Sequence, residues 1–246
     1  MLRIVVLLVV VILVGCQEAE KPAEKAKALL RQLPPGLHQK VIDIPEIGVV
    51  RYAIEIPHNY NDRSSVPFVL ALHFGYQGEE PPPFTGQGMI EAFRPALSEL
   101  GAVVIAPDVL GGNWSAATNE KLAVWLTERA LESYAIDRKQ VFVTGFSMGG
   151  AGTWHVAARH QDLFTAAIPV AARVPEDAVD WKILLYVIHS DADEVVPYDV
   201  AKQHAEELKA KGVNIEFKTI NGLTHFRTGD YAPFVRDAFV WLQTLK

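Results

Sequence analysis

The sequence predicts an α/β fold, in which a mostly parallel sheet is covered by helices on both faces. From Val49 onward, short apolar runs rich in β-branched residues alternate with longer amphipathic runs. Strand and helix patterns therefore take turns along the chain, which is typical of this class. Some apolar runs are continuous, as in KILLYVIHS at 182–190, and such runs indicate strands that helices bury on both faces.

The predicted elements follow one another in a single domain, 37–246. Strands are expected at 49–56, 67–73, 102–106, 141–144, 166–170, 183–189 and 213–220. Helices are expected at 89–99, 120–135, 147–160, 200–210 and 231–245. The connection RVPEDAVD, before the strand that follows Trp181, is short, so we expect little or no lid.

The N-terminus predicts an exported protein. Arg3 precedes an apolar run over 4–14, which is short of the roughly 20 residues that span a bilayer but suits a signal peptide. The run ends in LVGC, which resembles a bacterial lipoprotein signal, with an ordinary cleaved signal or an apolar anchor as alternatives. We therefore expect residues 1–15 to be removed, Cys16 to carry lipid, and the protein to be anchored facing the periplasm or on the cell surface. Residues 16–36 are charged and alanine-rich and predict a solvated tether.

Composition argues against several partners. The net charge of -6 gives no basic footprint for nucleic acid, so a small molecule or a neutral polymer is the expected partner. Cys16 is the only cysteine, so no internal disulfide can form. We expect a monomer that needs no cofactor, and no histidine pair has metal-ligand spacing with a third partner.

One serine lies between a strand pattern and a helix pattern. Gly145 to Gly149 reads Gly-x-Ser-x-Gly around Ser147, and this placement predicts a nucleophile on a strained turn. Side chains at 145 and 149 would collide with the opposing backbone. The following helix presents N–H groups that favour developing negative charge.

A serine nucleophile needs a base and an acid that orients the base. In this fold the acid follows a later strand and the histidine follows the last one. The run VIHSDADEVVP offers Asp191, Asp193 and Glu194, and NGLTHF offers His225.

From about Val49 the chain resembles the α/β-hydrolase superfamily, within the esterase group that includes polyhydroxybutyrate depolymerase-like, feruloyl and acetylxylan esterases. The resemblance lies in YAIDRKQVFVTGFSMGGAGTW, LFTAAIPVAA, HSDADEVVP and GLTH. The acid loop of those enzymes commonly reads His-Gly-x-x-Asp-x-x-Val-Pro, which aligns the acid with Asp193. The resemblance thus implies a triad of Ser147, Asp193 and His225, with Asp191 as a loop brace and His189 supporting the acid loop.

An oxyanion hole needs two donors. One is expected to be the N–H of Met148. Relatives usually have His-Gly after the strand ending in FVLALH, whereas this chain has His73 followed by Phe74, Gly75 and Tyr76. We expect the second donor to be the N–H of Gly75, with Phe74 or Tyr76 as alternates and His73 as a structural residue.

The substrate pocket is predicted from loops at the same sheet edge. Asn113 and Trp114 follow the third of the predicted strands and are candidates to wall the pocket with Phe74 and Tyr76, although Trp114 fits loop packing equally well. His155 and His160 are expected to pack or to face solvent.

The predicted activity is ester hydrolysis through an acyl-enzyme. The alternatives are a serine peptidase of the prolyl oligopeptidase type and a catalytically idle binding lipoprotein that kept the fold.

Overall fold

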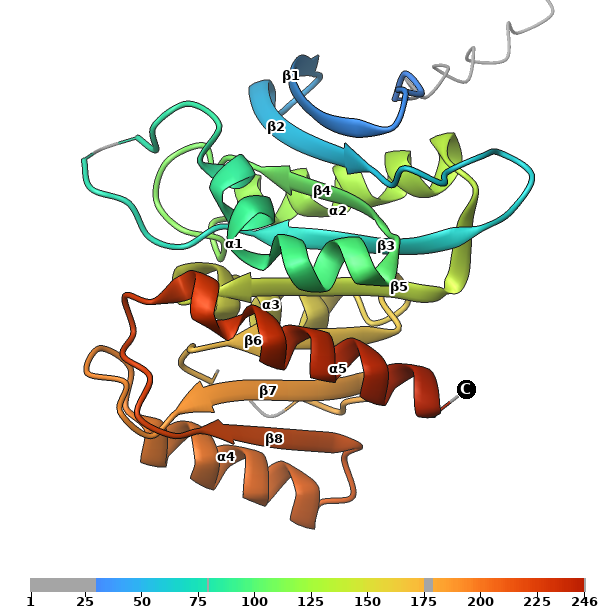
Figure 1. Ribbon diagram of the computed structural model, residues 1–246. Coiled ribbons are helices and arrows are strands. Elements are labelled where there is room, and N and C mark those ends of the chain that lie inside the picture. Colours follow the sequence, from blue (N-terminus) through green and yellow to red (C-terminus); the bar gives the residue numbers. More distant parts are fainter. Residues whose placement is uncertain (1–29, 79, 175–178, 246) are drawn as a thin grey trace, which may run out of the picture.

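The computed structural model describes residues 30–78, 80–174 and 179–245 (Figure 1). They form one sheet of eight strands in the order β1-β2-β4-β3-β5-β6-β7-β8. The strands are β1 (Gly36–Ile44), β2 (Gly48–Ile56), β3 (Val66–Leu72), β4 (Val103–Pro107), β5 (Ile136–Phe146), β6 (Ala166–Val170), β7 (Leu184–Ser190) and β8 (Ile215–Ile220). The helices are α1 (Thr85–Leu100), α2 (Ala117–Ser133), α3 (Met148–Arg159), α4 (Tyr198–Ala210) and α5 (Ala232–Thr244), with a short 3₁₀ helix η1 (Thr228–Tyr231) before α5.

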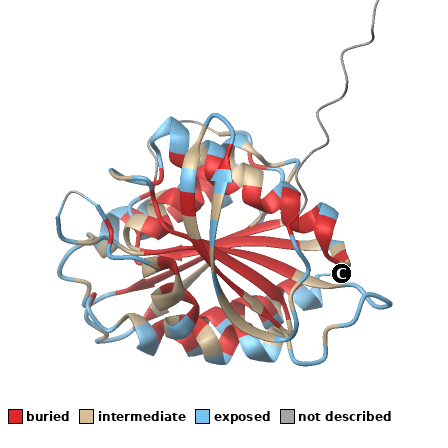
Figure 2. Ribbon diagram, turned by 90° about the horizontal axis from the view of Figure 1, so that it is seen from above, coloured by how far each residue is buried: buried red, intermediate tan, exposed pale blue. Residues whose placement is uncertain are grey.

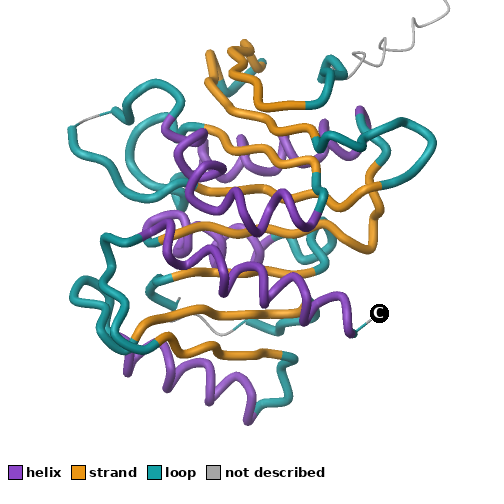
Figure 3. The backbone as a smooth tube through the Cα atoms, viewed as in Figure 1, coloured by secondary structure: helices purple, strands orange, loops and turns teal. Residues whose placement is uncertain are grey.

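The sheet is parallel from β4 through β3 to β8, and antiparallel where β2 joins β1 and β4. Helices cover both faces, with α1 and α5 in front of the sheet in Figure 1 and α2, α3 and α4 behind it (Figures 1 and 3). The strands are buried between these layers, as Figure 2 shows. The predicted α/β class and the helices on both faces are confirmed.

Side chains of β3 show how one strand serves two cores. Phe68, Leu70 and Leu72 belong to the core beneath α2, α3 and α4. Val69 and Ala71 belong to the core beneath α1 and α5. All five are fully buried, because successive side chains of a strand point to opposite faces and each face has its own layer of helices.

One strand was not predicted, and two elements begin four or more residues before their predicted starts. The strand β1 was not expected; its residues alternate between half-buried and exposed along the sheet edge, so its apolar signal is weak. The strand β5 begins at Ile136 rather than 141. The helix α1 begins four residues before the predicted Met89, at Thr85, because buried Asp108 accepts hydrogen bonds from the backbone N–H groups of Phe84 and Gly86.

The described end of the predicted tether lies against the domain. Leu30 is buried, and its N–H donates to Ser133 Oγ at 2.9 Å. Gln32 donates to the carbonyl of Ser133 at 2.7 Å. The packed structure therefore extends at least seven residues before the predicted boundary at 37. The predicted signal, 1–15, and Cys16 lie outside the described residues, within which no helix has both the length and the apolar character to cross a membrane.

Candidate active site

Ser147 occupies a strained turn between β5 and α3. Its φ of 55° and ψ of -113° lie where non-glycine residues are rare. The turn is fixed because the N–H of Ser147 donates to Val170 of the neighbouring β6, while its carbonyl accepts from Ala151 in α3. The serine side chain therefore lies at the carboxyl edge of the sheet, at the start of a helix.

The glycines around Ser147 are required by close backbone contacts. A Cβ added to Gly145 would lie 2.4 Å from the carbonyl oxygen of Gly149, and one added to Gly149 would lie 1.9 Å from that of Leu72. A Cβ on Gly150 would meet Ala172 at 2.5 Å. The predicted steric role of Gly145 and Gly149 is confirmed.

The structure brings Ser147, His225 and Asp193 into one chain of hydrogen bonds. Ser147 Oγ lies 2.8 Å from His225 Nε2, and His225 Nδ1 lies 2.8 Å from Asp193 Oδ2. Asp193 follows β7 and His225 follows β8. These two strands are parallel neighbours, so their following loops meet at the edge where Ser147 lies.

Asp193 is held as a carboxylate. Its side chain is fully buried, and its Oδ1 accepts hydrogen bonds from the N–H groups of Val195 and Val196 at 2.9 and 2.8 Å. Burial raises the pKa of this carboxyl, but the hydrogen bonds from His225 and from the two backbone groups outweigh burial and lower the pKa below its usual value. The second oxygen, Oδ2, is left to orient the His225 ring.

The other polar residues of the acid loop brace it. Asp191 Oδ1 accepts from the N–H of Gly222 at 2.8 Å, as expected for a brace. Buried His189 lies with Nε2 3.1 Å from the carbonyl of Val196, so Nε2 carries the proton and donates. Burial lowers the pKa of His189, which favours this neutral form.

His73 and Trp114 form the floor beneath the 74–77 loop. His73 Nε2 accepts from the N–H of Val109 at 3.2 Å, so Nδ1 must carry the proton that it donates to the carbonyl of Phe74. Burial lowers the pKa of His73, in keeping with a neutral ring. This is the structural role expected of it.

The prediction that Trp114 walls the pocket is wrong. Its side chain is fully buried, and its Nε1 donates to the carbonyl of His73 at 2.9 Å. It packs on Gly152 of α3, where an added Cβ would lie 2.3 Å from Trp114 Cβ. Asn113 lines no part of the cavity at Ser147; its side chain accepts from the N–H of Ser115 and its carbonyl accepts from Asn119.

A cavity of about 570 Å³ opens at Ser147 and His225. Phe74 and Tyr76, which were predicted for the pocket, line it, together with Gly75, the predicted second oxyanion donor. Sequence reasoning missed its other lining residues, which are Gln77, Phe146, Val195, Phe226 and Thr228. Two of these are apolar yet exposed, Phe226 by 79% and Val195 by 49%. Their signal in the sequence was an apolar residue directly after, or two after, a triad candidate.

Of the two predicted backbone donors, Gly75 lines this cavity, and Met148 directly follows Ser147, which also lines it. Met148 is the first residue of α3, and its N–H lies at the helix N-terminus, which attracts negative charge. Gly75 lies on the opposite segment, between Phe74 and Tyr76, and lines the same cavity. The side chain of Met148 packs into the core instead.

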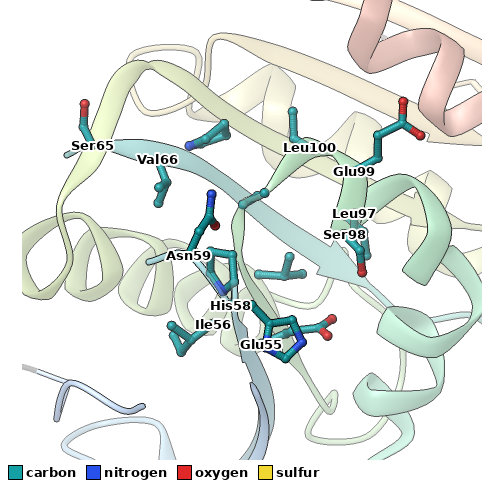
Figure 4. Close-up of a pocket in the computed structure, with 15 residues that line it drawn as sticks. Glu55, Ile56, His58, Asn59, Ser65, Val66, Leu97, Ser98, Glu99 and Leu100 are labelled. Atoms are coloured by element: carbon teal, nitrogen blue, oxygen red, sulfur yellow. The ribbon is translucent and has the colours of Figure 1, made fainter. Parts of the chain in front are cut away.

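A second cavity, of about 420 Å³, lies at the opposite edge of the sheet (Figure 4). Its lining comes from the end of β2, the start of β3 and the end of α1, including Glu55, His58 and Glu99. Because β3 begins at Val66 beside this cavity and Ser147 follows the far end of β5, the two cavities are separate.

His155 and His160 bind a carboxylate rather than only packing or facing solvent. Each lies with Nε2 within 2.9 Å of a Glu120 oxygen, and Arg159 Nε donates to the same residue at 3.0 Å. This cluster joins α2 to the far end of α3. Within the described ranges, no group of three or more His, Cys, Asp or Glu side chains is arranged so that it could hold a metal ion.

A doubly covered sheet with a serine on a strained turn, a buried carboxylate and a histidine in chain order is the arrangement of an α/β-hydrolase. A sequence model of the dienelactone hydrolase family matches residues 90–238, and the chain belongs to that family.

Curated relatives agree with this assignment. The chain is 25% identical over 182 residues to a protein of Aquifex aeolicus named "Putative carboxymethylenebutenolidase", covering 65% of this chain and 75% of that protein. It is 24% identical over 185 residues to "Probable feruloyl esterase C" of Aspergillus niger, covering 71% and 63% respectively. The family and these relatives place the chain among carboxylic ester hydrolases.

Solved structures show the same fold. A thermostable esterase has a TM-score of 0.71 at 23% identity, over 85% of this chain and 62% of its own. Est1E from Butyrivibrio proteoclasticus has a TM-score of 0.66 at 17% identity, over 84% of this chain and 99% of its own. The predicted α/β-hydrolase fold is confirmed.

Proposed function

We propose that the protein hydrolyses carboxylic esters through an acyl-enzyme formed on Ser147. The observation that carries the proposal is the chain of two 2.8 Å hydrogen bonds from Ser147 through His225 to Asp193. With Nδ1–H of His225 donating to Asp193, Nε2 is the free base that accepts the serine proton.

The reaction has two halves. Ser147 attacks the ester carbonyl as His225 takes its proton, and the imidazolium then protonates the departing alkoxide. Water, activated by the same nitrogen, attacks the acyl-enzyme and releases the acid. Asp193 keeps the ring in the required tautomer and stabilises its charged form.

The tetrahedral intermediate places negative charge on the former carbonyl oxygen. We assign the N–H of Met148 as one donor and that of Gly75 as the other, with Phe74 and Tyr76 as alternates for the second. Gly75→Pro removes the N–H and is expected to lower kcat about 10² to 10³-fold, whereas Gly75→Ala keeps it. Equal activity of the two variants would rule out Gly75 as a donor.

We propose a neutral ester with an apolar acyl or alcohol group as substrate, either small or attached to a polymer. Exposed Phe226 and Val195 offer apolar contact beside His225. The name of the Aquifex aeolicus relative describes a lactone that carries a carboxylate, yet the residues that line this cavity include no lysine or arginine to bind one. A panel of p-nitrophenyl acetate, butyrate and octanoate, with a carboxylated lactone as the contrast, tests this preference.

We further propose that Cys16 carries a lipid anchor after removal of residues 1–15 and holds the exported domain at a bacterial membrane. The support is the LVGC sequence after an apolar run. Partition of the full-length protein into detergent, lost in Cys16→Ala, is the expected result.

The test of the central proposal is the activity of Ser147→Ala. Purified protein should hydrolyse a short acyl p-nitrophenyl ester and be labelled by a fluorophosphonate, and both properties should be lost in this variant. Ser98→Ala, which changes an exposed serine of α1, is the control and should behave as wild type. Labelling that persists in Ser147→Ala would overturn the assignment. A folded wild-type protein that neither turns over nor labels would favour the idle binding protein.

A further inference from the structure

Two loops that are far apart in the sequence meet at the triad. Residues 190–194 begin at the last residue of β7 and carry Asp193, and residues 221–225 follow β8 and carry His225. Because β7 and β8 are parallel neighbours, the loops lie side by side at the same sheet edge, which Figure 1 shows at the arrowheads of these strands. The second loop contains Gly222, whose φ of 72° marks a sharp turn with no strand or helix to hold it.

Side chains of the first loop accept hydrogen bonds from backbone N–H groups of the second. Asp191 Oδ1 accepts from Gly222 at 2.8 Å, and Ser190 Oγ accepts from Leu223 at 3.1 Å. Glu194 Oε2 accepts from His225 at 3.0 Å. Three acceptors on one loop therefore fix three of the four backbone positions from 222 to 225.

The last of these bonds acts on the proposed base itself. Asp193 and Glu194 are consecutive, and they hold the same histidine at two points, its ring and its backbone. His225 is buried, so its N–H has little access to water if the acceptor is lost. Glu194 is exposed, so replacing it removes little packing.

We propose that Glu194 is a positioning residue that keeps His225 Nε2 in hydrogen-bonding distance of Ser147 by accepting the backbone N–H of His225. This inference rests on the proposed function. Glu194 contributes an acceptor oxygen, which its side chain is long enough to place at the N–H of His225. Its charge is not required.

Three variants of Glu194 separate the effects of its acceptor oxygen, the length of its side chain and its charge. Glu194→Gln keeps an acceptor oxygen at the same reach, and its kcat should stay within about threefold of wild type. Glu194→Asp keeps the charge but shortens the side chain, and Glu194→Ala removes both. The kcat of these two should fall about 10 to 100-fold with KM within about twofold, because a displacement of about 1 Å at a catalytic group can lower the rate by about 10².

Glu206→Ala, which removes an exposed carboxylate from α4, is the matched control and should match wild type in kcat and KM. Wild-type kcat in folded Glu194→Ala would overturn the proposal. So would a kcat of Glu194→Gln as low as that of Glu194→Asp, which decides the question if Glu194→Ala does not fold.

A second readout does not depend on turnover. Hydrogen exchange of the peptide that covers 221–228 should speed up in Glu194→Asp and Glu194→Ala but not in Glu194→Gln, because the His225 amide loses its acceptor only in the first two. Unchanged exchange in all three variants would contradict the proposed positioning role of Glu194 even if the wild-type protein proved inactive. Failure of the proposed role of Glu194 and failure of the proposed function are therefore distinguished.

Discussion

The turn that holds Ser147 and the loop at 74–77 line the same cavity, but they differ in the room they leave for side chains. A Cβ on Gly149 would lie 1.9 Å from a backbone oxygen, whereas a Cβ on Gly75 would meet no atom within 4 Å. The serine turn is fixed by contact between backbones, which no side-chain movement can relieve. The 74–77 loop has open space on its cavity side and rests on the floor formed by His73 and Trp114.

This difference explains why the geometry of the first region could be predicted, whereas for the second only the lining role of Phe74 and Tyr76 could. Close packing of β5 on α3 requires glycine, so Gly145 and Gly149 mark the turn in the sequence itself. Nothing in the run from Phe74 to Gln77 requires its residue types, and the position of the loop depends on distant contacts. The hydrogen bond from Trp114 to His73 joins positions 41 residues apart, and no local pattern announces it.

The largest expected effect comes from removing the floor. Trp114→Ala should lower the free energy of unfolding by about 3 to 5 kcal/mol, because it leaves a cavity beside Gly152 and removes the donor to His73. Denaturant unfolding measures the change. Phe226→Ala also removes an aromatic side chain, but one that is 79% exposed, and should change stability by less than about 0.5 kcal/mol. Equal losses in the two variants would contradict the assigned burial.

Next in size is the effect of Gly149→Ala, which tests the tight packing of the turn that holds Ser147. The added methyl group cannot fit beside the carbonyl of Leu72, so α3 must shift away from the end of β3. Stability should fall by about 1 to 3 kcal/mol or more, and kcat by about 10² because Ser147 moves with the helix. Stopped-assay kinetics and thermal unfolding report the two effects. Wild-type kcat would show that the turn is less constrained than its contacts indicate.

A smaller effect is expected from the far end of α3, where Glu120 is bound by His155, His160 and Arg159. Burial raises the pKa of Glu120, but these hydrogen bonds dominate and lower it to about 2 from 4.5. A depressed carboxyl pKa stabilises the fold fully above the unfolded value of 4.5, and this contribution disappears as pH falls from 4.5 toward 2.

Glu120→Gln should therefore lower stability by about 1 to 2 kcal/mol at pH 7 and flatten the acid limb below pH 4.5. Unfolding curves from neutral pH to pH 3 measure both changes. Glu206→Gln, on exposed α4 surface, is the control. A loss that grows on acidification would reverse the assigned sign.

The smallest effect should come from Gly75→Ala, which tests whether the 74–77 loop has room for a side chain. The new methyl group enters open space, so stability should change by less than about 0.5 kcal/mol. The backbone N–H is kept, so kcat should stay within a few-fold. A large loss in stability would mean that the loop is as tightly packed as the serine turn.

Much of the fold was predictable because buried strands have continuous apolar runs, as at β7. The edge strand β1 was not, since one side of its backbone has no neighbouring strand and its side chains are only partly buried. In the site, chain order and a short motif predict Ser147 and His225, whereas Asp193 was selected from three acidic residues by the resemblance of its loop to that of related esterases. The roles of Ser190 and Glu194 did not follow, because the hydrogen bonds that they accept from the N–H groups of Leu223 and His225 depend on which strands become neighbours.

The positive φ of Ser147 sets function against stability at one residue. A side chain in this sparsely populated region raises the free energy of the folded state by about 1 to 3 kcal/mol, and glycine would adopt it without that penalty. If selection for hydrolysis were lost, replacement of Ser147 by glycine would therefore stabilise the fold. The presence of serine there means that the chain retains a reactive group against the preference of its own backbone.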